Sequence, residues 1–150
     1  MLGFGDKAFE FFRMINPIEH ARTKELAKKY KVEPYVISAD VYAENNLVGR
    51  GGWTWYTGSS SWMYIAGIKY ILGLKQENGY LSITPCIPKD WKKYSIKYKY
   101  KDAIFNITIY NENGKNSSVA KFLVNGEEIA DKKLKLEEKS GVYNIDVFMG

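Results

Sequence analysis

The residues best suited to chemistry lie in one glycine- and tryptophan-rich segment, residues 49–59, which reads Gly-Arg-Gly-Gly-Trp-Thr-Trp-Tyr-Thr-Gly-Ser. Glycine lets a backbone approach a ligand closely, and residues 57–61 supply hydroxyls at the start of an apolar run. If that run is helical, its unpaired N–H groups and its positive end both favour an anion. Three aromatic side chains in the segment offer faces on which sugar rings stack: Trp53, Trp55 and Tyr56. The segment predicts an anion site beside an aromatic surface.

A structural interpretation of the same segment competes with this one. The hydroxyls of residues 57–60 could cap a core helix, and the tryptophans could fill the core. A nucleotide-binding P-loop is excluded, because it needs a lysine directly before the Ser or Thr at the helix start. The residue types alone leave the anion site and the structural cap both open.

Few other side chains are candidates for acid–base chemistry. Asp6 falls at a predicted helix start, where a carboxylate is an ordinary cap, and Asp40 lies within an apolar run. His20 is the only histidine, so a structural role is expected and it cannot hold a metal alone. Glu33 is the stronger candidate, because a carboxylate between two apolar residues could accept hydrogen bonds from sugar hydroxyls. An ion pair between Glu33 and Arg50 is the equally weighted alternative.

The composition excludes several classes of protein. The net charge is +5, but nineteen of the twenty-two basic residues are lysines spread along the chain, which argues against nucleic-acid recognition. The single cysteine, Cys86, excludes an internal disulfide and is expected to be a buried hydrophobe in a reducing compartment. The chain has no secretory leader pattern and no apolar run of membrane-spanning length. We expect a cytoplasmic protein that binds neither membranes nor nucleic acid.

The first half of the chain has helical periodicity. Apolar residues at helix spacing predict a helix over residues 5–15, ended at Asn16 and Pro17, and a second helix over residues 19–30. Residues 61–74 are apolar on every side, with Lys69 as the only charge, which predicts a helix buried all round. Such a helix needs more surrounding structure than the first sixty residues offer. Because Leu2 and Gly3 resemble a helix end, the chain is expected to begin within a larger fold.

The second half changes to a period of two. Strands are predicted over residues 80–84, 94–100, 104–110, 119–124 and 142–148. Asn125 and Gly126 form a strong hairpin signal, because both central turn positions require positive φ. Over residues 92–101, lysines alternate with tyrosine and isoleucine, so a solvated lysine face is expected. We expect an α+β chain, with a helical part at residues 1–77 and an antiparallel, jelly-roll-like β-sandwich at residues 78–150.

Several motifs, in chain order, resemble the closing stretch of glycoside hydrolase family 94. The similarity continues in order to about Tyr110, and the sequence around residues 51–55 is most similar to that of the family's β-1,2-glucan members. The motifs are Asn-Pro-Ile at 16–18, His-Ala-Arg-Thr at 20–23, Tyr-Lys-Val-Glu-Pro-Tyr-Val at 30–36, Ala-Asp-Val-Tyr at 39–42, residues 49–59, and Pro-Cys-Ile-Pro at 85–88 with Trp91.

The resemblance implies a particular architecture and reaction. The family has an (α/α)6 catalytic barrel followed by a β-sandwich, and its phosphorylases cleave a β-glucosidic bond with inversion, giving an α-sugar 1-phosphate. Inorganic phosphate is the co-substrate and no cofactor is implied. Thr57 and Gly58 match family positions whose hydroxyl and amide bind that phosphate, and Glu33 and Tyr35 are implied as substrate-binding residues.

The family's general-acid aspartate lies upstream of these motifs, so no catalytic residue is expected within this chain. We therefore expect the C-terminal portion of a hexosyltransferase of the phosphorylase type, inactive alone and dependent on an upstream catalytic portion. Its ligands would be a β-linked oligosaccharide and phosphate, and a homodimer is implied for the full-length enzyme. The alternative is a non-catalytic β-sandwich module that binds carbohydrate or oligomerises.

Overall fold

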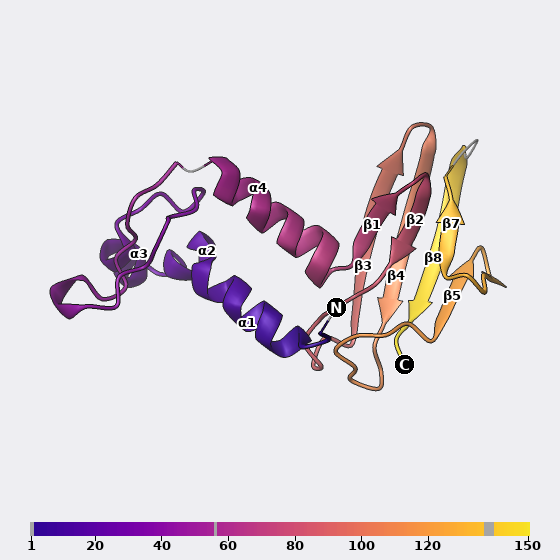
Figure 1. Cartoon of the computed structure of the whole chain (residues 1–150), viewed down its shortest axis with the longest axis horizontal. Helices are drawn as coiled ribbons and strands as arrows, with labels where there is room; N and C mark the ends of the chain where they lie inside the picture. Colours follow the sequence, from indigo (N-terminus) through magenta and orange to yellow (C-terminus); the bar gives the residue numbers. More distant parts are fainter. Residues whose placement is uncertain (1, 56, 137–139) are drawn as a thin grey trace. The chain divides into compact units, whose positions relative to one another are not determined.

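The structure, a computed structural model, describes residues 2–55, 57–136 and 140–150 (Figure 1). The chain divides into two compact units. The first unit comprises Met1–Phe9 and Ile68–Gly150, and the second comprises Glu10–Gly67. The second unit contains the segment of chemical interest, and the first contains the strands.

The helical elements precede the strands, as the change of period predicts. They are α1 Gly5–Ile15, α2 Pro17–His20, α3 Lys24–Tyr30, the 3-10 helix Asn45–Leu47, α4 Thr57–Ile65 and the π-helix Ala66–Ile71. The predicted helix over residues 5–15 is confirmed. The single helix predicted over residues 19–30 is wrong, because the chain interrupts it between His20 and Lys24.

Capping side chains explain that interruption. Asn16 caps α2 through its side-chain oxygen, which accepts from the backbone N–H of Ile18 at 3.1 Å. Thr23 caps α3 in the same way, with its Oγ1 accepting from the backbone N–H of Leu26 at 3.2 Å. Each cap satisfies an amide that would otherwise lack a partner, so two short helices replace one longer helix.

The apolar helix differs from its prediction in extent and in burial. It begins at Thr57, changes to a π-helix at Ala66 and ends at Ile71. The expectation of burial all round is wrong, because Trp62, Tyr64 and Tyr70 are 70%, 69% and 52% exposed. An apolar helix is stabilised by burial, but its composition does not show whether other segments of the same chain cover it.

The strands form two sheets. They are β1 Leu74–Glu77, β2 Tyr80–Ile83, β3 Lys93–Tyr100, β4 Ala103–Tyr110, β5 Lys121–Val124, β6 Glu127–Glu128, β7 Lys133–Lys135 and β8 Gly141–Phe148. Three strands follow the order β1-β2-β7, and five follow the order β3-β4-β8-β5-β6 (Figure 1). All pairs are antiparallel except β4 with β8, which is parallel, so the expectation of a wholly antiparallel sandwich needs that correction. The α+β class is confirmed.

Residue alternation fixes the faces of the larger sheet. Along β3, Lys93, Lys97 and Lys99 are exposed, and the tyrosines and Ile96 between them are half-buried, which confirms the predicted lysine face. Asn125 and Gly126, with φ of 50° and 87°, join β5 to β6 as the predicted two-residue turn.

The two sheets enclose one core. Buried residues come from both sheets: Leu81 and Ile83 on β2, Leu134 on β7, Ala103, Phe105, Ile107 and Ile109 on β4, Phe122 and Val124 on β5, and Ile145 and Val147 on β8. Tyr98 on β3 donates from its hydroxyl to Oε1 of Gln76 on β1 at 3.3 Å, which links one sheet to the other. Cys86 is buried as predicted, and burial raises the pKa of its thiol.

Candidate functional site

The glycine-rich segment pairs with residues 39–42 in an irregular hairpin of the second unit. The backbone N–H of Ala39 donates to the carbonyl of Trp53 at 2.7 Å, and that of Tyr42 donates to Arg50 at 2.9 Å. The N–H of Gly51 donates to the carbonyl of Tyr30 at 2.8 Å, which fastens the hairpin to the end of α3. Tyr30 is wholly buried, and Gly51 of the hairpin lies against its ring. Backbone hydrogen bonds and this contact together position the hairpin.

Gly51 and Gly52 serve packing rather than ligand approach. A Cβ at Gly51 would overlap the side chains of Val32 and Tyr30, and one at Gly52 would overlap the carboxylate of Asp40. The surroundings of these two glycines therefore do not support the expectation that a ligand approaches the backbone there. Asp40 itself is exposed, and its side chain lies against this turn.

Gly58 has the opposite environment. It is exposed in the first turn of α4, and a Cβ added there would meet nothing within 4 Å. The first turn of α4 carries no acidic residue that would oppose an anion. Thr57 begins the helix, but its side chain and all of Tyr56 lie outside the described residues, so the predicted hydroxyl contact has no geometry here. The N–H groups of the first turn lack partners within the helix, and the surface beside the Gly58 Cα is open.

The aromatic residues beside this helix start lie on the surface. Trp53, Trp55 and Tyr35 are 74%, 64% and 74% exposed, so the interpretation that the tryptophans fill the core is wrong. Tyr35 and Trp55 meet edge to face, with ring centroids 6.3 Å apart. Trp55 has φ of 66°, a strained conformation for a bulky residue, two positions before α4. Tyr35 and Trp55 thus form an exposed aromatic pair, of which Trp55 lies just before the start of α4.

Glu33 is half-buried and is not held by the predicted ion pair. The salt bridges among the described residues do not include one between Glu33 and Arg50, and Arg50 is exposed. The carbonyl of Glu33 accepts from the N–H of Val36 at 3.3 Å, a turn that leaves Tyr35 outside. No described hydrogen bond, ion pair or ring contact joins Glu33 to Tyr35 or to Gly58.

His20 has the structural role that the sequence predicts, whereas the capping role predicted for Asp6 is wrong. Nε2 of His20 lies 2.6 Å from the carbonyl of Met14, and its ring stacks on Tyr30 at 4.8 Å. The carboxylate of Asp6 accepts from the backbone N–H of Lys89 at 3.0 Å, which ties α1 to a loop of the first unit instead of capping its own helix.

No group of acidic, histidine or cysteine side chains within the described ranges could hold a metal. Across those ranges, no helix is long and apolar enough to cross a bilayer.

Sequence reasoning missed a cavity in the first unit. It is lined by residues from four separate segments, among them Lys75, Thr84 and Lys132. No local motif joins segments that are brought together only by strand pairing, so the sequence carried no signal for it.

Comparison with known proteins gives this chain a class. Residues 1–73 match the catalytic domain of the Glycosyl hydrolase 94 superfamily, and residues 74–130 match the C-terminal domain of Glycosyl hydrolase family 65. The helical segment and the two-sheet domain thus each match a domain of glycosyl hydrolases.

The relatives agree with that class. Cyclic beta-(1,2)-glucan synthase NdvB of Rhizobium meliloti is 44% identical over 104 residues, which are 69% of this chain and 4% of the relative. N,N'-diacetylchitobiose phosphorylase of Vibrio furnissii is 32% identical over 130 residues, and solabiose phosphorylase of Paenibacillus borealis is 30% identical over 129 residues. Each of these two alignments covers 85% of this chain and 16% of the relative. Residues 1–73 therefore belong to the end of a Glycosyl hydrolase 94 superfamily catalytic domain and residues 74–130 to a Glycosyl hydrolase family 65 C-terminal domain, and the chain spans only a small part of the curated relatives that it matches.

Proposed function

We propose that this chain is the C-terminal portion of an inverting β-glucoside phosphorylase and contributes one corner of its phosphate site. The relatives that cover most of the chain include two phosphorylases, of N,N'-diacetylchitobiose and of solabiose. The similarity to a cyclic β-1,2-glucan synthase supports a β-linked glucan as the substrate class. Activity requires an upstream portion, and the assembled enzyme is cytoplasmic and dimeric in this proposal.

The observation that carries the proposal is the open start of α4. Gly58 faces free space, and the N–H groups of the first helical turn have no helical partners. A dianionic phosphate is a suitable ligand for such a helix end, because backbone donors and the helix dipole act together. In this proposal, Thr57 and Gly58 bind phosphate through the threonine hydroxyl and the glycine amide.

The chemistry that this corner supports is nucleophilic displacement by phosphate. An inverting hydrolase uses a carboxylate base to activate water, whereas phosphate is already a nucleophile and needs positioning. Tyr35 and Glu33 would hold the glucosyl unit, with the exposed tyrosine ring against its C–H face and the carboxylate accepting from hydroxyls. The acid that protonates the leaving sugar would come from the upstream portion.

The proposed division of the chain follows from the same scheme. Residues 1–77 would complete an (α/α)6 barrel, and residues 78–150 would form the β-sandwich domain. β1 precedes that division in sequence and pairs with β2 across it.

Two experiments test the proposal. The 150-residue chain, incubated with phosphate and a β-1,2-linked glucose disaccharide, should release no α-glucose 1-phosphate. Release of that product would contradict the upstream location of the acid. In the second experiment, this chain replaces the matching stretch of the Vibrio furnissii phosphorylase, and the chimera should phosphorolyse N,N'-diacetylchitobiose. A chimera that is folded by circular dichroism but inactive would count against the proposal.

A variant of Gly58 tests the phosphate role within the chimera. Gly58→Ala should raise the KM for phosphate by roughly tenfold, because the methyl group would occupy the open corner. The fold should not suffer, since alanine in a helix is up to about 1 kcal/mol more favourable than glycine. Ser60→Ala, at an exposed position of the same helix, is the matched control and should leave the KM unchanged. Equal effects of the two variants would refute a local phosphate contact.

A further inference from the structure

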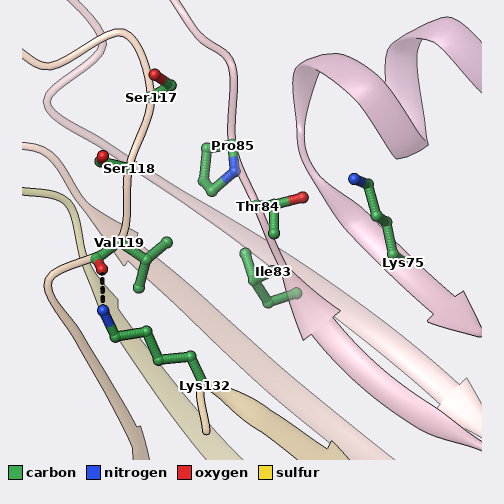
Figure 2. Close-up of a pocket in the computed structure, with 8 residues that line it drawn as sticks. All are labelled: Lys75, Ile83, Thr84, Pro85, Ser117, Ser118, Val119 and Lys132. Atoms are coloured by element: carbon green, nitrogen blue, oxygen red, sulfur yellow. Dashed lines mark hydrogen bonds between the residues drawn. The ribbon is translucent and has the colours of Figure 1, made fainter. Parts of the chain in front are cut away.

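The first unit contains a cavity that is remote in sequence from the proposed phosphate corner. It has a volume of about 400 Å³ and lies where β2 ends, between residues 83–85 and the loop before β5 (Figure 2). Figure 2 shows the eight side chains that line it: Lys75, Ile83, Thr84, Pro85, Ser117, Ser118, Val119 and Lys132. Ligand sites commonly have volumes of roughly 300–1,000 Å³, so this space fits a small molecule.

Backbone hydrogen bonds fix both walls. On one wall, the N–H of Thr84 donates to the carbonyl of Gly73 at 2.8 Å. On the other wall, Ser117 forms an isolated antiparallel bridge with Cys86, and Asn116 accepts from the N–H of Ile87 at 2.8 Å. The cavity is therefore preformed, and a ligand would not have to order its walls.

One end of the cavity carries an unsatisfied donor beside a cation. Oγ1 of Thr84 is buried and has no hydrogen-bond partner. In Figure 2 this hydroxyl points toward the ammonium group of Lys75, which is half-buried on β1. A buried hydroxyl without a partner costs about 1–3 kcal/mol, a cost that a ligand acceptor would offset.

Each end of the cavity carries a lysine. At the other end, Nζ of Lys132 donates to the carbonyl of Val119 at 2.5 Å and keeps two further protons for other acceptors (Figure 2). Two ammonium groups and three hydroxyls line the space, and none of the eight lining residues carries a carboxylate. This donor-rich, acid-free lining favours an anion, and lysines with hydroxyls suit the several oxygens of a phosphoryl group.

The middle of the cavity is apolar. Ile83, Pro85 and Val119 separate the two polar ends. A bare phosphate ion would leave this part empty, whereas the C–H surface of a sugar ring would cover it. Ser118 lines the same wall with φ of 82°, a left-handed conformation that is costly for a non-glycine residue and that clusters at ligand sites.

We propose that this cavity binds a small sugar phosphate, with the phosphoryl group at Thr84 and Lys75 and the sugar ring over the apolar middle. Hydroxyls of the sugar would reach Lys132 and the serine wall. This site is independent of the phosphorolysis proposed above, because none of its residues lies in the second unit.

Titration calorimetry on the 150-residue chain tests the site, with glucose 6-phosphate as the probe. Thr84→Val and Lys75→Met should each weaken binding by roughly tenfold or more. Thr84→Val keeps the side-chain shape and removes a hydroxyl that bonds to nothing, so the urea midpoint should not fall. Lys97→Met, on the exposed face of β3, removes the same charge elsewhere and should bind the probe normally.

Comparison of ligands and variants completes the test. Glucose should bind far more weakly than glucose 6-phosphate, and inorganic phosphate should bind more weakly too. Equal binding of phosphate and glucose 6-phosphate would overturn the sugar contact, and absence of binding at millimolar probe would overturn the site. Loss of binding in Gly58→Ala, with Thr84→Val unaffected, would assign the ligand to the start of α4 and also overturn the proposal.

Discussion

Asn111 is a wholly buried polar side chain that organises the turn after β4. Its Nδ2 donates to the carbonyls of Trp91 and Lys115 at 3.0 and 2.9 Å, and its Oδ1 accepts from the N–H of Lys115 at 2.7 Å. Asn111→Ala leaves these groups unpaired and should lower the free energy of unfolding by about 2–3 kcal/mol in urea titrations. Asn106→Ala, which removes one exposed bond to Asn144, should cost about 0.5 kcal/mol or less. Similar losses in both variants would contradict the structural role of Asn111.

Asp6 makes stability depend on pH. The backbone N–H of Lys89, and then the side chain of Asn116, hold the pKa of Asp6 below its ordinary value of 3.8. Because folding lowers this pKa, the ionised carboxylate stabilises the fold above the unfolded pKa, and the benefit is lost as the pH falls through the folded pKa. Asp6→Asn should therefore be less stable than the natural chain above about pH 5, and the difference should shrink below about pH 4. Urea midpoints measured from pH 7 to pH 2 check this, and a constant difference would refute it.

At the residue scale, the sequence predicted roles better than contacts. The structural use of His20 and the burial of Cys86 follow from residue type and number, and both are confirmed. The partner of Asp6 is eighty-three positions away in the sequence. The cavity beside Thr84 forms only because the loop before β5, residues 117–119, lies opposite it. Contacts of this kind are set by strand register, which local spacing does not specify.

Gly73 joins the π-helix to β1 at a position where no side chain fits. Its φ is 79°, and a Cβ would overlap the backbone of Thr84 and Pro85. Gly73→Ala should therefore lower stability by about 3 kcal/mol, through both the left-handed strain and the overlap. Gly79, with φ of 78° in the β1–β2 turn, has nothing within 4 Å of such a Cβ. Gly79→Ala carries only the conformational cost, about 1 kcal/mol.

Thermal unfolding followed by circular dichroism separates the two glycine variants. A much larger fall in Tm for Gly73→Ala than for Gly79→Ala is the expected result. Equal shifts would show that the close approach at Gly73 relaxes freely.

At the element scale, periodicity predicted the three long strands and the short strands β2 and β5, and it missed β1, β6 and β7. β3, β4 and β8 each have eight residues with clear alternation. The sequences of β1, β6 and β7 are Leu-Lys-Gln-Glu, Glu-Glu and Lys-Leu-Lys. Each contains at most one apolar residue, so no alternation of apolar and polar residues can be detected in it. Their pairing depends on neighbouring strands, and so does the parallel pairing of β4 with β8. The proposed anion corner could be predicted from the sequence, because one continuous segment carries it.

At the scale of the whole molecule, the two units differ in how they use their apolar residues. Among the described residues, sixteen of eighteen buried hydrophobic side chains belong to the first unit, and the second contributes only Tyr30 and Val36. Conversely, thirteen of the eighteen exposed large hydrophobic side chains belong to the second unit. Burial of apolar surface is the main favourable term in folding, so the second unit should be the less stable one.

Native-state hydrogen exchange with mass spectrometry tests this asymmetry. Amides of β4 and β8 should exchange most slowly, because they lie in the centre of the larger sheet and open only with global unfolding. Peptides from residues 10–67 should exchange through a separate, lower-energy opening. In the chimera with the Vibrio furnissii phosphorylase, the same peptides should become protected, because the barrel would cover the exposed face of α4 around Trp62 and Tyr64. Uniform protection across both units of the isolated chain would contradict the asymmetry, and unchanged exchange in the chimera would contradict the covering role of the barrel.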